Sequence, residues 1–326
     1  MQLPADDPRL SPIHLRRELL AAGHTDRSLT RALARGDLAR PRRGAYTDGP
    51  SWRAMSREER YAVTCRAAYR QANTEVVLSH VSSLPFLVAP LWGLDLDEVH
   101  LTREDGLTGR RERGIQRHCG KLLDGDVVET HGLRVMSAVR AALETTMLGS
   151  TEAGLVVVNH FLHRGDFDVE ALRERYHGSM DYWPDSLATD LVLRLANPLV
   201  ESVAETRTEY FCFMRGLPRP IAQFEVRDGD MVVARLDFAF PDLGFWIEFD
   251  GRVKYERHLR PGENPADAVI REKRREELVA ELTGWRCLRI TWADLADPDA
   301  LERRIRRLIE SIRRERARRA NIRPAS

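Results

Sequence analysis

Three acidic residues inside one pair of predicted strands constrain the fold of this chain more than any other feature. Residues 232–251 read VVARLDFAFPDLGFWIEFDG, an alternating run and an aromatic, β-branched run joined by a turn-forming segment, 241–244. Asp237, Glu248 and Asp250 fall within these runs, although strands disfavour Asp and Glu. A carboxylate on a half-buried strand costs free energy unless it is paired or binds a metal.

The spacing of these acids suggests a metal site. Glu248 and Asp250 are two residues apart, so their side chains leave the same face of a strand. If Asp237 lies opposite them, three carboxylates converge on an oxygen-rich site suited to Mg²⁺ or Mn²⁺. The alternative is that the acids pair with the chain's many arginines on a solvated face. Residue spacing alone supports both interpretations equally.

Several ordered motifs between Glu205 and Leu295 resemble a nuclease family. They are ESVAETRTEY, LDFAFPD, IEFDG, EKRREEL and GWRCLRITWADL. The segment resembles the DUF559 branch of the PD-(D/E)xK nuclease superfamily, which is related to very-short-patch repair endonucleases. The resemblance implies a restriction-endonuclease-like central mixed sheet flanked by helices, and Mg²⁺-dependent cleavage of DNA. It implies metal ligands at Asp237, Glu248 and Asp250, with Glu205 in a supporting catalytic position.

The chain departs from the family pattern at a lysine. The second strand of the family usually reads Glu-x-Lys, and here Asp250 stands in the lysine position. The chain has only three lysines among 51 basic residues, and two of them, Lys254 and Lys273, follow the acidic strands closely. Lysine is a compact donor whose pKa falls on burial. We therefore expect Lys273, on the next helix, or less favourably Lys254, on the loop, to orient the attacking water or stabilise developing charge.

Residues 1–50 predict a small DNA-binding module. Two short helical runs end at Gly23 and Gly36, and a strand–turn–strand pattern with a basic tip follows over residues 38–47. This order is typical of a winged helix. Nine arginines outnumber three acids between Arg9 and Arg43, an excess of six positive charges suited to phosphate contact.

This N-terminal stretch also resembles a family of repressors. The segment ELLAAGHTDRSLTRALARGDLARPRRGAYTD is similar to the winged-helix domain of AbiEi-type antitoxins, which act as transcriptional repressors. The alternative is a helical hairpin that its arginines merely solvate. On the winged-helix interpretation, we expect DNA contacts from Arg31, Arg35, Arg40, Arg42 and Arg43.

Residues 51–180 are predicted to form a mixed α/β middle domain, and residues 181–326 the nuclease domain. The motifs SHVSSLPFL, EVHLT and GLRVMSAVRAALE resemble the body of AbiEi-like proteins. Four histidines in the middle region have no metal-ligand spacing, so we expect structural or surface roles for them; they are His80, His100, His118 and His131. No nucleophile–base signature, phosphate-binding glycine loop or cofactor motif occurs there.

Length and composition are typical of a soluble globular protein with two or three domains, here expected to be α/β, and no transmembrane helix is indicated. The chain has 326 residues, of which 43% are hydrophobic and 31% charged, and no apolar run is long enough for a transmembrane helix. Scattered cysteines and the lack of a signal-peptide pattern favour the cytoplasm. The net charge of +1 does not indicate nucleic acid, so local clusters carry that argument. One is the terminal helix predicted over residues 301–319, whose nine arginines either contact a DNA backbone or only solvate the helix.

Together these features predict a metal-dependent DNA endonuclease with a winged-helix module. Its expected cofactor is Mg²⁺ or Mn²⁺. Its expected partners are DNA, a cognate toxin or antitoxin protein implied by the AbiEi resemblance, and a second copy of the chain in a homodimer, but not a membrane. Two alternatives stay open. One is a non-catalytic transcriptional regulator or antitoxin that uses the nuclease fold as a scaffold, and the other is an enzyme that acts on RNA.

Overall fold

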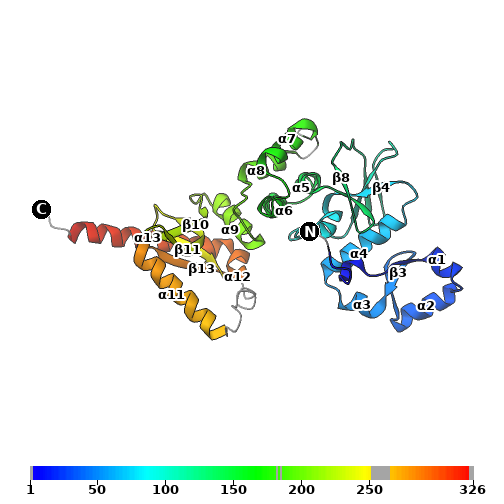
Figure 1. Ribbon diagram of the computed structural model, residues 1–326, viewed down its shortest axis with the longest axis horizontal. Helices are drawn as coiled ribbons and strands as arrows, with labels where there is room; N and C mark the ends of the chain where they lie inside the picture. The colour runs from blue at the N-terminus through cyan, green and yellow to red at the C-terminus, as the bar shows by residue number, and fades with distance from the viewer. Residues whose placement is uncertain (1–2, 181–182, 184–185, 251–264, 323–326) are drawn as a thin grey trace. The chain divides into compact units, whose positions relative to one another are not determined.

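The chain folds into two compact units, Met1–Pro198 and Leu199–Ser326. The computed structural model describes residues 3–180, 183, 186–250 and 265–322 (Figure 1). The mixed α/β class predicted from the sequence is confirmed. Within the described ranges, no helix combines the length and apolar character that crossing a membrane requires.

The first unit begins with a small module of helices and a hairpin. Its elements are η1 Pro8–Leu10, β1 His14–Leu15, α1 Arg16–Ala21, α2 Asp26–Arg35, β2 Leu38–Arg42 and β3 Ala45–Asp48. The central strand β3 pairs antiparallel with both β1 and β2. The Thr25 side chain caps α2 by accepting a hydrogen bond from the Ser28 N–H, and Gly36 ends the helix with φ of 78°. The predicted helices followed by a hairpin are confirmed.

This module does not enclose a core of its own. Ile13, Leu15 and Ala45 are buried in one cluster with Val63 and Ala67, which belong to the following part of the unit. A module of about 50 residues buries too little apolar surface to be stable alone. The predicted boundary at residue 50 therefore falls inside the first compact unit.

The rest of the first unit is a six-stranded sheet with helices. The strands are β4 Val76–Leu78, β5 Val99–Arg103, β6 Arg110–Glu112, β7 Ile115–His118, β8 Val127–Thr130 and β9 Leu133–Met136, in the order β6-β7-β5-β4-β9-β8. The helices are α3 Gly49–Ala54, α4 Arg57–Arg70, η2 His80–Ser82, η3 Leu84–Phe86, α5 Ala138–Thr146, α6 Thr151–Arg164, α7 Val169–Ser179 and α8 Ser186–Leu195.

Helix α8 belongs to this first unit, although the sequence suggested a boundary at residue 181. The hydroxyl groups of Thr189 in α8 and Thr146 in α5 lie 2.6 Å apart in the interior. Val192 of α8 is fully buried. These contacts place the boundary between the compact units after Pro198.

The second unit is a four-stranded mixed sheet flanked by helices. Its elements are α9 Val203–Met214, β10 Ile221–Asp228, β11 Met231–Phe240, β12 Phe245–Phe249, α11 Pro265–Thr283, β13 Arg286–Ile290, α12 Trp292–Ala296 and α13 Pro298–Ile322. The strand order is β10-β11-β12-β13. The first two pairings are antiparallel, and β13 lies parallel to β12. The central mixed sheet flanked by helices that the sequence predicted is confirmed.

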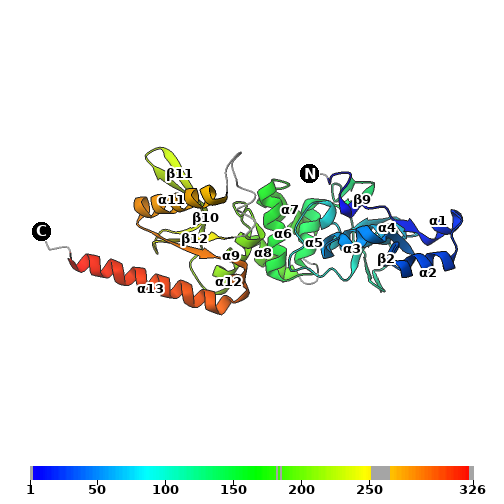
Figure 2. The ribbon, with the colours of Figure 1, turned by 90° about the horizontal axis from the view of Figure 1, so that it is seen from below.

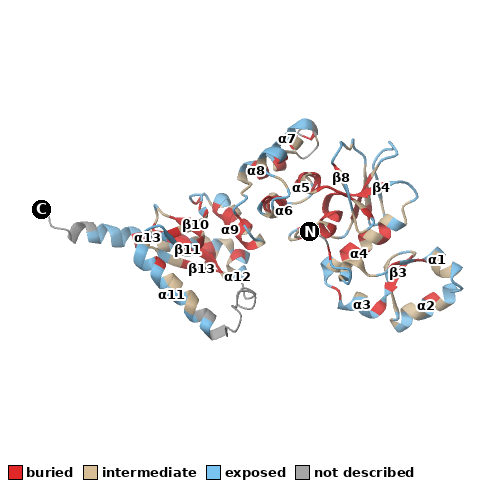
Figure 3. Cartoon of the chain, viewed as in Figure 1, coloured by how far each residue is buried: buried red, intermediate tan, exposed pale blue. Residues whose placement is uncertain are grey.

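Two apolar clusters hold helices to this sheet. One joins Phe238 and Ile247 of the sheet to α9 and α13, through residues such as Phe211 and Ile305. The other includes Leu236, Trp246 and Val279, and it packs α11 against the sheet. Buried residues accordingly concentrate in the strands, whereas the outer faces of α11 and α13 are exposed (Figure 3).

Candidate active site

Asp237 and Glu248 lie on adjacent strands of the second unit. The β11–β12 register ends at the pair Phe238–Ile247, and Asp237 and Glu248 are the next residue of each strand beyond that pair. Oδ2 of Asp237 accepts a hydrogen bond from the backbone N–H of Phe249 at 2.9 Å. The Asp237 carboxylate therefore lies beside β12.

A polar row crosses the sheet through this pair: Gln223, Asp237, Glu248 and Arg289. The β10–β11 register on either side of Gln223 sets it opposite Asp237, and β13 pairs Arg289 with Glu248. Gln223 has φ of 51°, a left-handed conformation that is uncommon outside glycine and is often found at functional sites. Polar residues on all four strands are unusual for the centre of a sheet.

Glu205 reaches this row through Gln223. Its Oε2 accepts hydrogen bonds from the backbone N–H of Glu201 at 3.0 Å and from Nε2 of Gln223 at 3.2 Å. Its Oε1 accepts from the Ser202 hydroxyl at 2.8 Å. Glu205 thus fixes the first turn of α9 and holds Gln223, which is a positioning role. It is 4% exposed, and its catalytic role stays a prediction.

Helix α11 presents Arg275, not Lys273, to Glu248. Nη2 of Arg275 lies 3.3 Å from Oε1 of Glu248 and 2.6 Å from Oε1 of Glu272. Helix residues that are two positions apart lie about 200° apart around the axis. Lys273 therefore lies on the side of α11 opposite to Arg275, where it is exposed. Burial lowers the pKa of Arg275, but the carboxylates of Glu248 and Glu272 outweigh burial and raise it above its ordinary value.

The other two predicted catalytic residues lie at the end of β12 and beyond it. Asp250 is half-buried, and its backbone N–H donates to the carbonyl of Ile290 at 2.8 Å. Lys254 falls in the segment 251–264, outside the described residues, so its role stays a prediction.

A divalent cation fits the Asp237–Glu248 pair but not the larger ligand set that we predicted. Within the described ranges, no group of three or more His, Cys, Asp or Glu side chains could hold a metal ion, so Asp237, Glu248 and Asp250 do not form one. Mg²⁺ is often bound through one or two carboxylates, with water and substrate phosphates completing its shell. Two carboxylates on adjacent strands meet that smaller requirement.

Exposed arginines lie on one side of α2 and on the hairpin. Arg27, Arg31 and Arg35 follow one another at helical-turn spacing and are exposed. Arg35 is paired with Asp37 at 2.9 Å. Arg40 and Arg43 of the hairpin are also exposed. This places four of the five predicted DNA contacts at the surface of the module.

Arg42, the fifth, faces inward. Burial lowers its pKa, and the nearby Arg117 guanidinium lowers it further. Its Nη1 is buried and, within the described part of the chain, has no hydrogen-bond partner. Arg42 is the last residue of β2, whereas its exposed neighbour Arg43 lies in the turn that follows.

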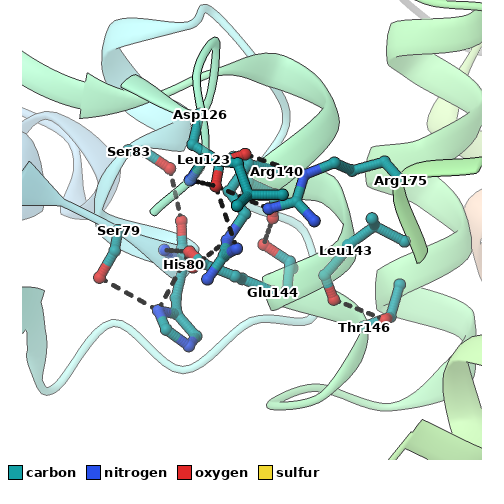
Figure 4. A network of polar contacts seen from close by, with 12 residues as sticks. Ser79, His80, Ser83, Leu123, Asp126, Arg140, Leu143, Glu144, Thr146 and Arg175 are labelled. Atoms are coloured by element: carbon teal, nitrogen blue, oxygen red, sulfur yellow. Dashed lines mark hydrogen bonds and ion pairs between the residues drawn. The ribbon is translucent and has the colours of Figure 1, made fainter. Parts of the chain in front are cut away.

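A buried polar network, which we did not predict, lies in the first unit (Figure 4). Arg140 donates from Nε to Oε1 of Glu144 at 2.7 Å and from Nη1 to Oδ2 of Asp126 at 3.2 Å. Glu144 also accepts the backbone N–H of His80 at 2.8 Å. Arg175 of α7 donates to both oxygens of Asp126, at 2.9 and 2.6 Å. Burial raises the pKa of Glu144.

Three of the histidines form a stack beside this network. The ring centroids of His80 and His118 are 3.8 Å apart, and those of His100 and His118 are 5.2 Å apart. Nδ1 of His100 and Nε2 of His118 lie 2.9 Å apart. Burial lowers the pKa of His80 well below its ordinary value and lowers the pKa values of His100 and His118 to about 4. The expected structural role fits these contacts.

The stack should make the first unit sensitive to acid. In the unfolded chain His100 and His118 bind protons near pH 6.5, whereas in the folded chain they do so only near pH 4. The unfolded state therefore binds more protons between these values, and stability falls as the pH falls. Each histidine should cost about 2 kcal/mol between pH 7.5 and pH 5. Urea titrations monitored by hydrogen exchange of β5 and β7 amides measure this loss.

A variant separates this effect from general acid sensitivity. His118→Gln keeps a polar side chain but cannot titrate. Between pH 7.5 and pH 5, its free energy of unfolding should fall by about 2 kcal/mol less than that of the natural chain. Equal losses in the two proteins would show that the stack does not control the pH dependence.

Comparison with known proteins leaves the chain without a family assignment: no family model and no curated protein matches it. A functional proposal therefore rests on the positions and contacts of the described residues.

Proposed function

We propose that the second unit hydrolyses phosphodiester bonds in DNA with the help of a divalent cation. The observation that supports this most is the position of two acids, Asp237 and Glu248, on adjacent strands just beyond the last β11–β12 pair, with the guanidinium of Arg275 3.3 Å from Glu248. When bound by these two carboxylates, Mg²⁺ or Mn²⁺ would lower the pKa of a coordinated water and neutralise charge on the phosphate.

The surrounding residues position the two carboxylates. Arg275 stays protonated at every relevant pH, so it places a positive charge 3.3 Å from Oε1 of Glu248. The N–H of Phe249 fixes one oxygen of Asp237. Glu205 holds Gln223, the neighbour of Asp237 in the polar row. Lys273 has no part in this proposal, because it is on the exposed side of α11.

Metal-dependent nicking of DNA tests the proposal. Purified full-length chain should nick supercoiled plasmid in Mg²⁺ or Mn²⁺ and leave it intact in EDTA. A single-stranded DNA and an RNA of the same sequence, assayed in parallel, decide the substrate class. If neither metal supports cleavage of any of these polymers, the catalytic proposal fails.

The N-terminal module would bring the chain to DNA. Arg40 and Arg43 are exposed on the hairpin and suited to phosphate contact. Replacing both with glutamine should weaken duplex binding and reduce the salt slope, d log K/d log[salt], by about two, because each phosphate contact contributes about one. Fluorescence anisotropy at several salt concentrations measures both quantities.

A matched control uses arginines that already have acidic partners. Arg16 pairs with Asp26 at 2.6 Å, and Arg57 pairs with Asp97 at 3.1 Å; both are exposed. Replacing these two with glutamine makes the same change in net charge. An equal loss of affinity in both double variants would remove the hairpin from DNA binding.

A non-catalytic regulator is the second candidate. The observation that favours it is the ion pair between Arg275 and Glu248, which already neutralises the buried carboxylate without a metal. On this account the second unit is a binding scaffold, and DNA binding by the first unit represses transcription. DNA binding that is unchanged by EDTA, in a protein with no metal affinity and no cleavage, would favour the regulator.

A further inference from the structure

Eight of the nine arginines between residues 301 and 319 of α13 fall into two groups, and the ninth, Arg313, is exposed outside both. The first group, which we call the arginine row, consists of Arg303, Arg307, Arg314 and Arg318. At 100° per residue these four lie within about 60° of one another around the helix. They are all exposed, and they point away from the stripe that packs on the sheet, which includes Leu301, Ile305 and Ile312.

The second group is held by partners within the chain. Arg306 pairs with Glu302 at 2.7 Å and Arg319 with Glu315 at 2.7 Å. Arg316 donates to the carbonyl of Asp242 at 2.8 Å. Arg304 pairs with Asp294 at 3.0 Å. These side chains therefore have roles within the fold.

The arginine row lacks such partners. Among the described residues, Arg303, Arg307 and Arg318 form no ion pair. Arg314 contacts Glu310, with its Nε donating to the carbonyl at 3.4 Å and its Nη2 lying 3.9 Å from the carboxylate. Arginines four residues apart on a helix repel each other and destabilise it. The row therefore carries uncompensated positive charge along one side of the helix.

The outer part of α13 is not explained by packing. Its apolar contacts with the sheet end at Ile312, and residues 313–319 are exposed throughout (Figure 2). These seven residues contain five arginines and one glutamate. Arg316 is tied to the Asp242 carbonyl, but a helix segment that is charged on every side and has no apolar contact needs another source of stability. A polyanion would supply it by neutralising the repulsion.

We propose that the arginine row binds the phosphate backbone of double-stranded DNA. The choice of DNA as the polymer rests on the proposed function. Arg303 and Arg318 are 15 residues apart, so the row spans about 22 Å. Guanidinium groups bind phosphate oxygens in a two-point geometry. The row thus forms a straight, rigid counterpart to a stretch of sugar-phosphate backbone.

Other polyanions fit the row less well. The stretch 301–319 contains no aromatic residue on which single-stranded bases could stack. A membrane-surface helix inserts its apolar face into lipid, but here that face is buried against the sheet. The major groove of B-form DNA admits a helix, whereas that of A-form RNA is deep and narrow. These features favour duplex DNA.

The experiment compares two triple variants of the full chain in EDTA, where no cleavage occurs. The row variant carries Arg303→Gln, Arg307→Gln and Arg318→Gln. The control variant makes the same charge change among partnered arginines, with Arg306→Gln, Arg316→Gln and Arg319→Gln. The probe is a labelled 20-base-pair DNA duplex, and circular dichroism with thermal melting checks that both variants are folded.

The row variant should bind about 100-fold more weakly at 0.1 M salt, with a salt slope lower by about three. The control variant should lose less than about fivefold in affinity. Equal losses in the two variants, or no loss in the row variant, would overturn the proposal. The experiment measures binding without metal, so its result does not depend on cleavage. A chain that does not cleave DNA can still show the expected loss of binding, and a chain that shows no such loss can still cleave DNA.

Two further measurements sharpen the result. Glu310 is the one acid within the row, so Glu310→Gln should tighten DNA binding by several-fold, since it removes a negative charge from the surface. A duplex RNA of the same sequence should bind at least about tenfold more weakly than the DNA. Weaker binding by Glu310→Gln, or equal binding of RNA and DNA, would contradict a duplex-DNA surface.

Discussion

Asp237→Asn is expected to reduce metal-dependent DNA cleavage by about 100- to 1,000-fold, and to leave DNA binding in EDTA unchanged or tighter. Asparagine keeps the shape of aspartate and can still accept the Phe249 N–H, but it removes one of the two charges that would hold the cation. The measurement is the rate of Mn²⁺-dependent plasmid nicking at saturating protein. Isothermal titration with Mn²⁺ alone should show affinity lost along with cleavage.

Two variants on α11 serve as controls for this result. Lys273→Ala changes an exposed side chain and should keep full cleavage. Arg275→Ala removes the cation beside Glu248 and should reduce cleavage, and a thermal melt must show that the fold survives. If the natural chain and Asp237→Asn have the same residual activity, the nuclease proposal is wrong and the scaffold account replaces it.

The largest expected effect on stability comes from the first unit. Glu144→Ala should lower the free energy of unfolding of this unit by about 3–5 kcal/mol, because it leaves Arg140 with one acidic partner and the His80 N–H without its acceptor. Glu144 is 0% exposed, so water does not replace the hydrogen bonds that its carboxylate accepts. Urea unfolding followed by hydrogen exchange in α5 measures the change.

An exposed ion pair provides the comparison. Glu170 pairs with Arg173 at 3.3 Å, three residues along α7, and its side chain is 75% exposed. Glu170→Ala should cost less than about 1 kcal/mol. A loss of similar size in the two variants would mean that the buried network contributes no more than a surface pair.

Local patterns in the sequence were enough to locate the acidic pair. The alternation in segment 232–240, the turn that follows and the aromatic run 245–249 predict a hairpin, and its short turn brings Asp237 and Glu248 onto adjacent strands. The helix face of α11 was harder to assign, because it depends on which residues meet the sheet. Val279 is buried and lies four residues from Arg275, a spacing that places Arg275 toward the sheet.

The polar interior of the first unit could not be read from the sequence. His80, His100 and His118 follow one another in the sequence at intervals of 20 and 18 residues. They come together only because β4, β5 and β7 lie side by side in one sheet. Arg140 and Glu144 have the spacing of a helix-surface ion pair, and such pairs are usually exposed. Their burial depends on packing between distant elements, which no local pattern records.

A crystal of the full chain soaked in Mn²⁺ tests the central claim most directly. Anomalous diffraction locates manganese without reference to activity. One manganese peak is expected between the carboxylates of Asp237 and Glu248, and none in crystals of Asp237→Asn. The absence of a peak at millimolar Mn²⁺, with Arg275 still paired to Glu248, would contradict the central claim.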